Sequence, residues 1–265
     1  MSQGFLVFAH DNEQIEYGLM ALYQAKRIKK FLNKPVSIVM DTLTQTNLTS
    51  KHANWRDYFD QVINRDSVAT QTKRYGAGDN QLTFHNLDRT DAFHLTPYDE
   101  TILIDTDIII QTSNLNKLWN NQEELLVCDK CSTLYGNKED EFKWVSDQGI
   151  KFYWATVCYF KKTQYVEMFF NHCKWVKKNY RWLSYIHELM AGPVRNDYIW
   201  SIALHALNHP APTIPFNLKY STYSDTILEI SNDKIKFLTP NGVCKIADDV
   251  HVFNKYQLLE FEGKL

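Results

Sequence analysis

The chain has 265 residues, of which 44% are hydrophobic and 23% charged, a composition typical of globular rather than disordered or collagen-like proteins. It has 29 basic and 31 acidic residues, so its formal net charge of −2 provides no whole-chain attraction for nucleic acid. No apolar run approaches the roughly 18 residues of a membrane span, and the N-terminus lacks the pattern of a secretory signal. We therefore expect a single domain over residues 1–265, cytoplasmic and without a membrane partner.

The first forty residues predict a strand, a helix and a second strand. Gly4–Ala9 is a continuous apolar run, as expected for a strand buried on both faces. Hydrophobic residues then recur every three or four positions from Ile15 to Leu32, which predicts an amphipathic helix, and Pro35–Met40 follows as a strand. Such a βαβ unit implies a parallel sheet, whose ligands bind beyond the carboxyl ends of the strands. The polar residues expected at that edge are His10, Asp11, Asn12 and Asp41. For Asp11 and Asn12, capping of the helix that follows is the competing interpretation.

The remainder of the chain alternates strand and helix patterns. Residues 42–95 are polar and irregular, with Gly76 and Gly78 marking a loop, and Thr101–Ile110 is the next strong strand. The other predicted elements are strands at Glu124–Cys128 and Phe152–Phe160, helices over 169–183 and Asp197–Leu207, and a small hairpin formed by Thr226–Glu229 and Ile235–Leu238. The fold class expected from this order is α/β, with a mostly parallel sheet flanked by helices and a small C-terminal β-hairpin region.

The five cysteines show no regular spacing, although Cys128 and Cys131 form a C-x-x-C pair. A structural zinc site would need a second such pair, and a redox pair would normally open a helix after a strand. Two thiols near the end of a buried strand, in a reducing compartment, are therefore the favoured interpretation.

Two carboxylates, Asp105 and Asp107, lie within the apolar segment ILIDTDIII. Burying unpaired carboxylates is costly, so they require a cation or a strand end that opens to solvent. In an extended chain both side chains project to the same side, with Cα atoms roughly 6.5 Å apart, and both can reach one divalent ion. Hard oxygen ligands suit Mg²⁺ or Mn²⁺. The alternative is a turn in which both aspartates are solvated caps.

This D-x-D segment, about one hundred residues into the chain, resembles that of nucleotide-sugar glycosyltransferases of the GT-A fold, in the neighbourhood of the glycogenin-like and bacterial galactosyltransferase-like group. The resemblance continues in order along the chain. It includes the polar stretch 86–89, the strand 153–157, the helix opening Arg195-Asn196-Asp197, and the C-terminal segment 250–255.

The resemblance implies a Rossmann-like GT-A fold and the transfer of a sugar from a UDP-sugar to a hydroxyl acceptor. It implies Mn²⁺ or Mg²⁺ as the cofactor, held by Asp105, Asp107 and His251. It implies Asp197 as the catalytic residue, for which a cap at the helix start is the alternative. The donor-binding residues that it implies are His10, Asp11, Asn12, Asp41, Arg89, Thr106, Trp154, Ala155 and Lys255. For His251, Arg89 and Lys255 the competing interpretation is an ordinary surface side chain.

Basic and aromatic residues alternate in Lys174–Trp182, a pattern that suits a nucleic-acid groove, although a solvated helix face is the competing interpretation. The chain also resembles bacteriophage-encoded enzymes of this fold that add sugars to hydroxymethylated cytosine. Double-stranded DNA is therefore the predicted acceptor. If the protein is phage-encoded, it is expected in the host cytoplasm. A glycan or protein acceptor is the alternative. The rival functions are a nucleotidyl- or phosphotransferase, for which no P-loop is visible, and a nucleotide-sugar-binding module without turnover.

Overall fold

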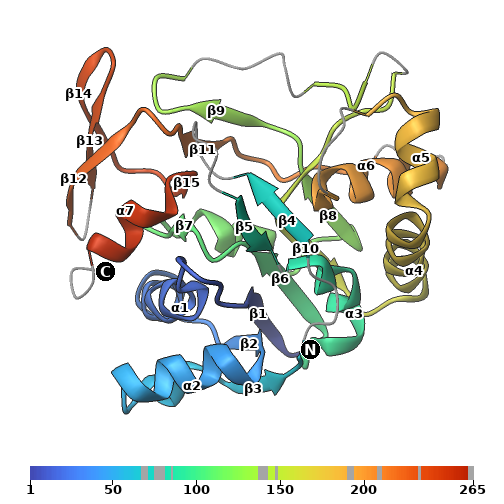
Figure 1. The fold of residues 1–265 in the computed structure, drawn as a ribbon. Helices are drawn as coiled ribbons and strands as arrows, with labels where there is room; N and C mark the ends of the chain where they lie inside the picture. Colours follow the sequence, from blue (N-terminus) through green and yellow to red (C-terminus); the bar gives the residue numbers. More distant parts are fainter. Residues whose placement is uncertain are drawn as a thin grey trace.

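The computed structural model describes residues 1–66, 71–74, 81–84, 86–136, 143–146, 149–189, 194–207, 211–231 and 234–261. Its centre is a six-stranded sheet in the order β3-β2-β1-β6-β10-β8 (Figure 1). The neighbouring pairs among β3, β2, β1 and β6 are parallel, and β10 runs antiparallel to both β6 and β8. These strands are β1 (Gln3–Ala9), β2 (Val36–Met40), β3 (Gln61–Asn64), β6 (Glu100–Ile104), β8 (Leu125–Cys128) and β10 (Trp154–Lys161). The predicted α/β fold with a mostly parallel sheet is confirmed.

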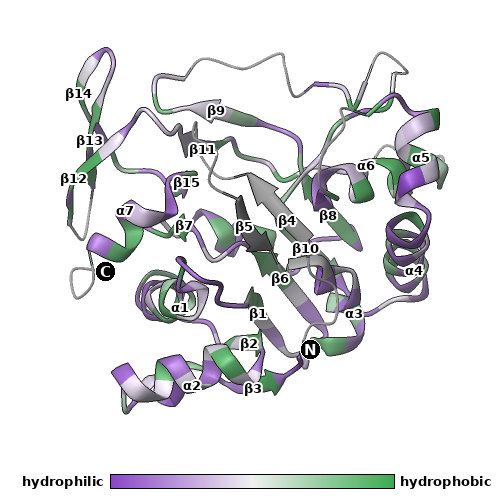
Figure 2. Ribbon diagram, in the orientation of Figure 1, coloured by the Kyte–Doolittle hydropathy of each residue, from purple (hydrophilic) through white to green (hydrophobic). Residues whose placement is uncertain are grey.

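Helices cover both faces of this sheet. Helix α1 (Tyr17–Leu32) packs on β1 and β2 with α2 (Thr42–Lys51) beside it, and α6 (Asn196–Ala206) packs on β10 with α4 (Gln164–Lys178) against it. Figure 1 shows α1 on one side of the sheet and α4 and α6 on the other. Strands β2 and β6 are buried at every position, as expected for interior strands of a sheet covered on both faces. Figure 2 shows hydrophilic positions on α2 and α4 between the hydrophobic ones that pack inward.

A second sheet of four short strands lies beside the first, in the order β7-β15-β11-β9. These strands are β7 (Ile108–Ile109), β9 (Cys131–Thr133), β11 (Leu218–Ser221) and β15 (Val250–Val252). Two strands of the central sheet continue into it, since β7 follows β6 and β9 follows β8 after a few residues. The turn between β6 and β7 therefore lies where the two sheets meet.

The C-terminal part forms an antiparallel sheet of β12 (Thr226–Ile230), β13 (Ile235–Thr239) and β14 (Gly242–Ile246), followed after β15 by helix α7 (Lys255–Glu260). The predicted hairpin is present as β12 and β13, and β14 extends it by one strand. The inward side chains Ile227, Ile235 and Phe237 form a small core with residues next to and within α1. No helix in the part of the chain that the structure describes is long and apolar enough to cross a membrane.

Two predicted elements are divided in the structure. The segment Thr101–Ile110 was expected to be one strand, but a turn over residues 105–107 separates β6 from β7. Here the tertiary pairing of β7 with β15 overrides the strand pattern of the apolar residues. The helix predicted over 169–183 is interrupted at Asn179, which ends α4 and precedes α5 (Tyr180–Ile186). The Asn179 side chain donates to the Trp175 carbonyl, a local bond that competes with helix continuation.

The segment expected to be polar and irregular, residues 42–95, contains regular elements. Gly76 and Gly78, predicted to mark a loop, lie outside the described residues. The elements in this segment and shortly after it are α2, β3, β4 (Gln71–Arg74), β5 (Gln81–Phe84), α3 (Ala92–Leu95) and the 3₁₀ helices η1 (Trp55–Tyr58), η2 (Asn86–Asp91) and η3 (Asn114–Leu118). Helix α2 buries only Thr44 and Leu48, so its sequence carries too weak a periodic pattern to predict it.

Candidate functional site

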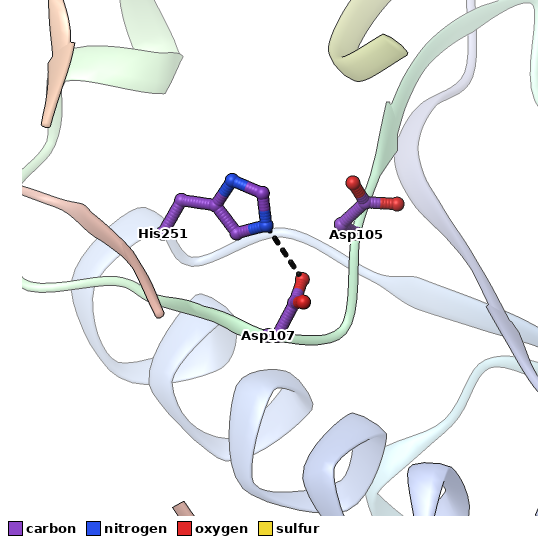
Figure 3. A group of neighbouring side chains, drawn as sticks. All are labelled: Asp105, Asp107 and His251. Carbon is purple, nitrogen blue, oxygen red and sulfur yellow. Dashed lines mark ion pairs between the residues drawn. The ribbon is translucent and has the colours of Figure 1, made fainter. Parts of the chain in front are cut away.

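Asp105, Asp107 and His251 converge where the central sheet meets the second sheet. Each offers a ligand atom within 4.8 Å of the others, and together they are a group that could hold a metal ion. Figure 3 shows the three side chains near one another, with Asp107 and His251 turned toward each other. Two of them come from the turn after β6 and one from β15. The pairing of His251 with Ile108 across β15 and β7 brings the histidine to the turn. The expected convergence of the two aspartates is therefore present, but a turn rather than an extended strand produces it.

The three side chains suit a divalent cation chemically. Two carboxylates and an imidazole are ligands that Mn²⁺ accepts, and the carboxylates also suit Mg²⁺. Asp107 Oδ1 is buried and accepts no well-formed hydrogen bond among the described residues, although His251 Nε2 lies 3.2 Å away. A buried carboxylate with one imidazole neighbour at this distance is stabilised further when a cation approaches it. The chemistry of the three side chains therefore fits the metal that the resemblance implies.

Two basic side chains contact the acidic pair directly. Arg89, on η2, forms an ion pair with Asp105, and Lys255, at the start of α7, forms one with Asp107. Burial raises the pKa of the Asp105 carboxyl above its usual range. Burial acts in the same direction on Asp107, but the charges of Lys255 and His251 outweigh it and hold the pKa of that carboxyl well below its usual range. The site therefore holds one firmly ionised carboxylate and two fixed positive charges.

Arg89 keeps unused hydrogen-bond donors in this site. Its side chain is 2% exposed and its guanidinium lies 5.8 Å from the ring centroid of Trp200. Its Nε and Nη2 atoms are buried and have no hydrogen-bond partner in the described parts of the chain. Such donors suit oxygen atoms of an anionic ligand, because a guanidinium binds phosphate or carboxylate through several N–H groups.

The predicted catalytic Asp197 lies in the first turn of α6 and is bound on both oxygens. Its Oδ1 accepts from the Ala155 amide at 2.8 Å, and its Oδ2 accepts from Arg195 Nη2 at 2.8 Å. Arg195 is the N-cap residue, so the alternative in which Asp197 caps its own helix is wrong. The side chain instead joins α6 to β10, the strand that carries Trp154 and Ala155. The pairing with Arg195 is a contact that the sequence analysis missed.

Trp154 is packed into an aromatic cluster that extends to the metal-site residues. Its ring lies 5.9 Å from that of Tyr220 and 6.5 Å from that of Phe253, measured between centroids. Phe253 in turn contacts the His251 ring edge-on at 5.0 Å. Trp154 and His251 are thus linked through one shared neighbour, although they are far apart in sequence. The predicted Thr106 lies in the turn between the two aspartates and lines a small cavity against α1.

The predicted residues at the carboxyl ends of β1 and β2 are engaged locally. Asp11 accepts from the Gly18 amide in the first turn of α1 and from Asn47, and Asp41 caps α2 through the Thr44 amide at 2.8 Å. Asn12 accepts from the amides of residues 14 and 15, and His10 Nε2 lies 3.4 Å from the Arg65 carbonyl oxygen. Asp11 thus makes the capping contact that was its competing interpretation, whereas the amides bound by Asn12 precede α1. Asp41 caps a helix that the sequence did not predict. A role for these residues in donor binding stays a prediction.

Two features of the sequence remain, the C-x-x-C pair and the basic and aromatic segment Lys174–Trp182. Cys128 and Cys131 are free thiols with sulfur atoms 3.6 Å apart at the ends of β8 and β9, and burial raises the pKa of Cys131 well above its usual value. In the Lys174–Trp182 segment, Lys174 pairs with Asp91 at 2.7 Å. Lys177 lies 3.4 Å from Asp88. Two of the charges expected to form a nucleic-acid surface are therefore offset by aspartates.

No family model matches the chain, and no curated protein matches it. Among solved structures, the galactosyltransferase LgtC in complex with donor and acceptor sugar analogues is 13% identical, with a TM-score of 0.48 over 74% of this chain and 68% of that one. Mouse xyloside xylosyltransferase 1 is 10% identical, with a TM-score of 0.46 over 80% and 84% of the two chains. The glycosyltransferase GlyE of Streptococcus pneumoniae is 10% identical, with a TM-score of 0.46 over 81% and 46%. These likenesses are too distant to assign a family, so the functional conclusion depends on the residues of the site.

Proposed function

We propose that this protein is a metal-dependent glycosyltransferase that moves a sugar from a UDP-sugar to a hydroxyl acceptor. The observation that carries the proposal is the convergence of Asp105, Asp107 and His251 between two sheets, with Arg89 and Lys255 in contact with the two aspartates. A site with two carboxylates, an imidazole and two cations is suited to bind a metal together with a diphosphate. The resemblance of the D-x-D segment points to the same chemistry.

Each residue has a part in this proposal. Asp105, Asp107 and His251 would hold Mn²⁺ or Mg²⁺, which supplies positive charge to a departing nucleoside diphosphate. Arg89 has two buried nitrogen atoms, Nε and Nη2, whose N–H groups can bind phosphate oxygens, and Lys255 adds a second fixed charge. In the proposal, Asp197 and the adjoining β10 residues lie beneath the reacting sugar.

The proposal is tested by incubating the purified full chain with a panel of UDP-sugars and Mn²⁺ and measuring release of UDP. We expect slow hydrolysis without an acceptor, and loss of release in EDTA that Mn²⁺ restores. Asp107→Asn should abolish release, whereas Glu229→Gln, which neutralises an acid on the exposed C-terminal sheet, serves as the matched control. Turnover in EDTA at the full rate would overturn the metal assignment. Binding of a UDP-sugar without hydrolysis or transfer would instead indicate a binding module.

For the acceptor we propose, as the first to test, hydroxymethylated cytosine in double-stranded DNA. The support is the outer face of α4 and α5, where Trp175 and Trp182 are 48% and 58% exposed and Lys178 and Arg181 are also exposed. Exposed rings beside basic side chains can stack on bases and contact phosphates. Replacing Lys178 and Arg181 together with Gln should reduce transfer to DNA at low salt and leave hydrolysis of the donor unchanged. Transfer to a glycan or protein but not to DNA would reject this acceptor and retain the enzyme.

A further inference from the structure

Helix α1 presents two buried polar side chains to the backbone of the D-x-D turn. Gln24 is 2% exposed and donates from Nε2 to the carbonyl oxygens of Asp105 at 2.5 Å and Ile108 at 3.3 Å. Arg27, one helical turn later and 4% exposed, donates from Nε to the Ile110 carbonyl at 2.6 Å. The two side chains therefore bind carbonyl groups along the whole segment that carries both candidate carboxylate ligands.

The backbone of this segment is also bonded to β10 and β15. The Asp105 amide donates to the Thr156 carbonyl of β10 at 3.0 Å, and the Asp107 carbonyl accepts from the Val252 amide of β15 at 2.8 Å. These bonds attach the turn to the two sheets on either side. Gln24 is the side chain that spans it, because it contacts residues both before and after the turn. A change in Gln24 would therefore alter the separation of the two carboxylates rather than either carboxylate itself.

A small cavity of about 10 Å³ lies between α1 and this segment, and its lining includes Met20, Gln24, Arg27 and Thr106. Gln24 Oε1 and Arg27 Nη2 are buried and have no hydrogen-bond partner among the residues that the structure describes. These two polar atoms lie on neighbouring turns of α1, on the side of the helix that contacts the D-x-D segment.

We propose that Gln24 and Arg27 are positioning residues of the candidate metal site that hold the D-x-D turn in the geometry in which its carboxylates converge. This inference rests on the proposed function, since it concerns the same site. Neither side chain is placed to contact the ion. Their action is through the backbone of residues 105–110, and it precedes any binding of metal or donor.

The test compares the Mn²⁺ affinity of variants in the full-length chain, measured by titration of free Mn²⁺ by electron paramagnetic resonance. Gln24→Met keeps the size of the side chain and removes its donor. We expect it to weaken Mn²⁺ binding roughly 10-fold or more, the effect typical of losing a group that orients metal ligands. Arg27→Met should act in the same direction. The matched control is Met20→Leu, since Met20 lines the same cavity without bonding to the turn, and its affinity should equal that of the wild type.

A second measurement is made without metal. Hydrogen exchange of the amides in residues 105–108 should be faster in Gln24→Met than in the wild type, and unchanged in Met20→Leu. A variant that melts at a lower temperature but binds Mn²⁺ as tightly as the wild type, with unchanged exchange in the turn, would show a structural role only and overturn the inference. If Gln24→Met does not fold, Arg27→Met decides between the same outcomes. Failure of the wild type to bind Mn²⁺ would instead reject the proposed metal site, and the exchange experiment would still test how the turn is held.

Discussion

Replacing Arg89 by Met should destabilise the protein in a way that a divalent ion reverses. The substitution leaves Asp105 without its ion-pair partner in a site where burial already raises its pKa. Breaking a buried ion pair by removing one partner costs about 3–5 kcal/mol. Asp105 keeps 22% of its side chain exposed, so we expect the lower end, about 3 kcal/mol. For a chain of this size that corresponds to a fall in Tm of roughly 6–12 °C.

The assay is thermal unfolding of the wild type and Arg89→Met with and without Mn²⁺. An ion at about 1,000 times its Kd adds about 4 kcal/mol of stability, provided that it binds the folded state alone. Because Arg89 and the ion both neutralise Asp105, Mn²⁺ should raise the Tm of the variant more than that of the wild type. Lys51→Met is the control, since Lys51 pairs with Glu16 at an exposed site and its loss should cost at most about 1 kcal/mol. An Arg89→Met protein that melts within 2 °C of the wild type would refute the reasoning, as would equal Mn²⁺ shifts in both.

Two further predictions concern packing and pH. Gly4→Ala should lower the free energy of unfolding, measured in urea, by about 1–3 kcal/mol, because the new Cβ would lie 2.3 Å from the buried ring of Tyr98. A change below about 0.5 kcal/mol would mean that the ring moves aside freely. Burial opposes ionisation of Asp91, but its bonds to Lys174 and Arg65 outweigh burial and lower the pKa of this carboxyl. The ionised Asp91 should therefore stabilise the fold fully at neutral pH, and this stabilisation should be lost as the pH falls through the folded-state pKa. The melting temperature of Asp91→Asn should therefore be lower than that of the wild type at pH 7, and the two should be equal at a pH below the folded-state pKa of Asp91. A difference in melting temperature that does not change with pH would contradict this.

The parts of the fold that the sequence predicts are those in which local pattern and tertiary environment agree. Gly4–Ala9 and Pro35–Met40 are apolar because both faces of β1 and β2 are covered, and the periodicity from Ile15 to Leu32 matches the packing of α1. Where long-range contacts decide, prediction fails. The apolar residues 108–110 continue the strand pattern, but their pairing with β15 bends the chain at the aspartates. No local signal reports a partner more than one hundred residues away.

The same limit applies to the site. The unusual position of Asp105 and Asp107 in an apolar run is visible in the sequence, and the resemblance directed attention to His251. Gln24 and Arg27 gave no such signal, since polar residues on an amphipathic helix ordinarily face solvent. Only the depth at which α1 is buried distinguishes them.

The contact between Asp107 and Lys255 joins residues 148 positions apart in the chain. Closing a loop of that length costs roughly 4 kcal/mol of chain entropy, and such contacts tend to form late in folding. An ion shared by the D-x-D turn and β15 would act as a removable cross-link across this loop. Interactions that are absent from the transition state slow unfolding and leave the folding rate almost unchanged. Metal would then protect the finished protein against unfolding without helping it to form, and a chain interrupted before β15 would lack that protection.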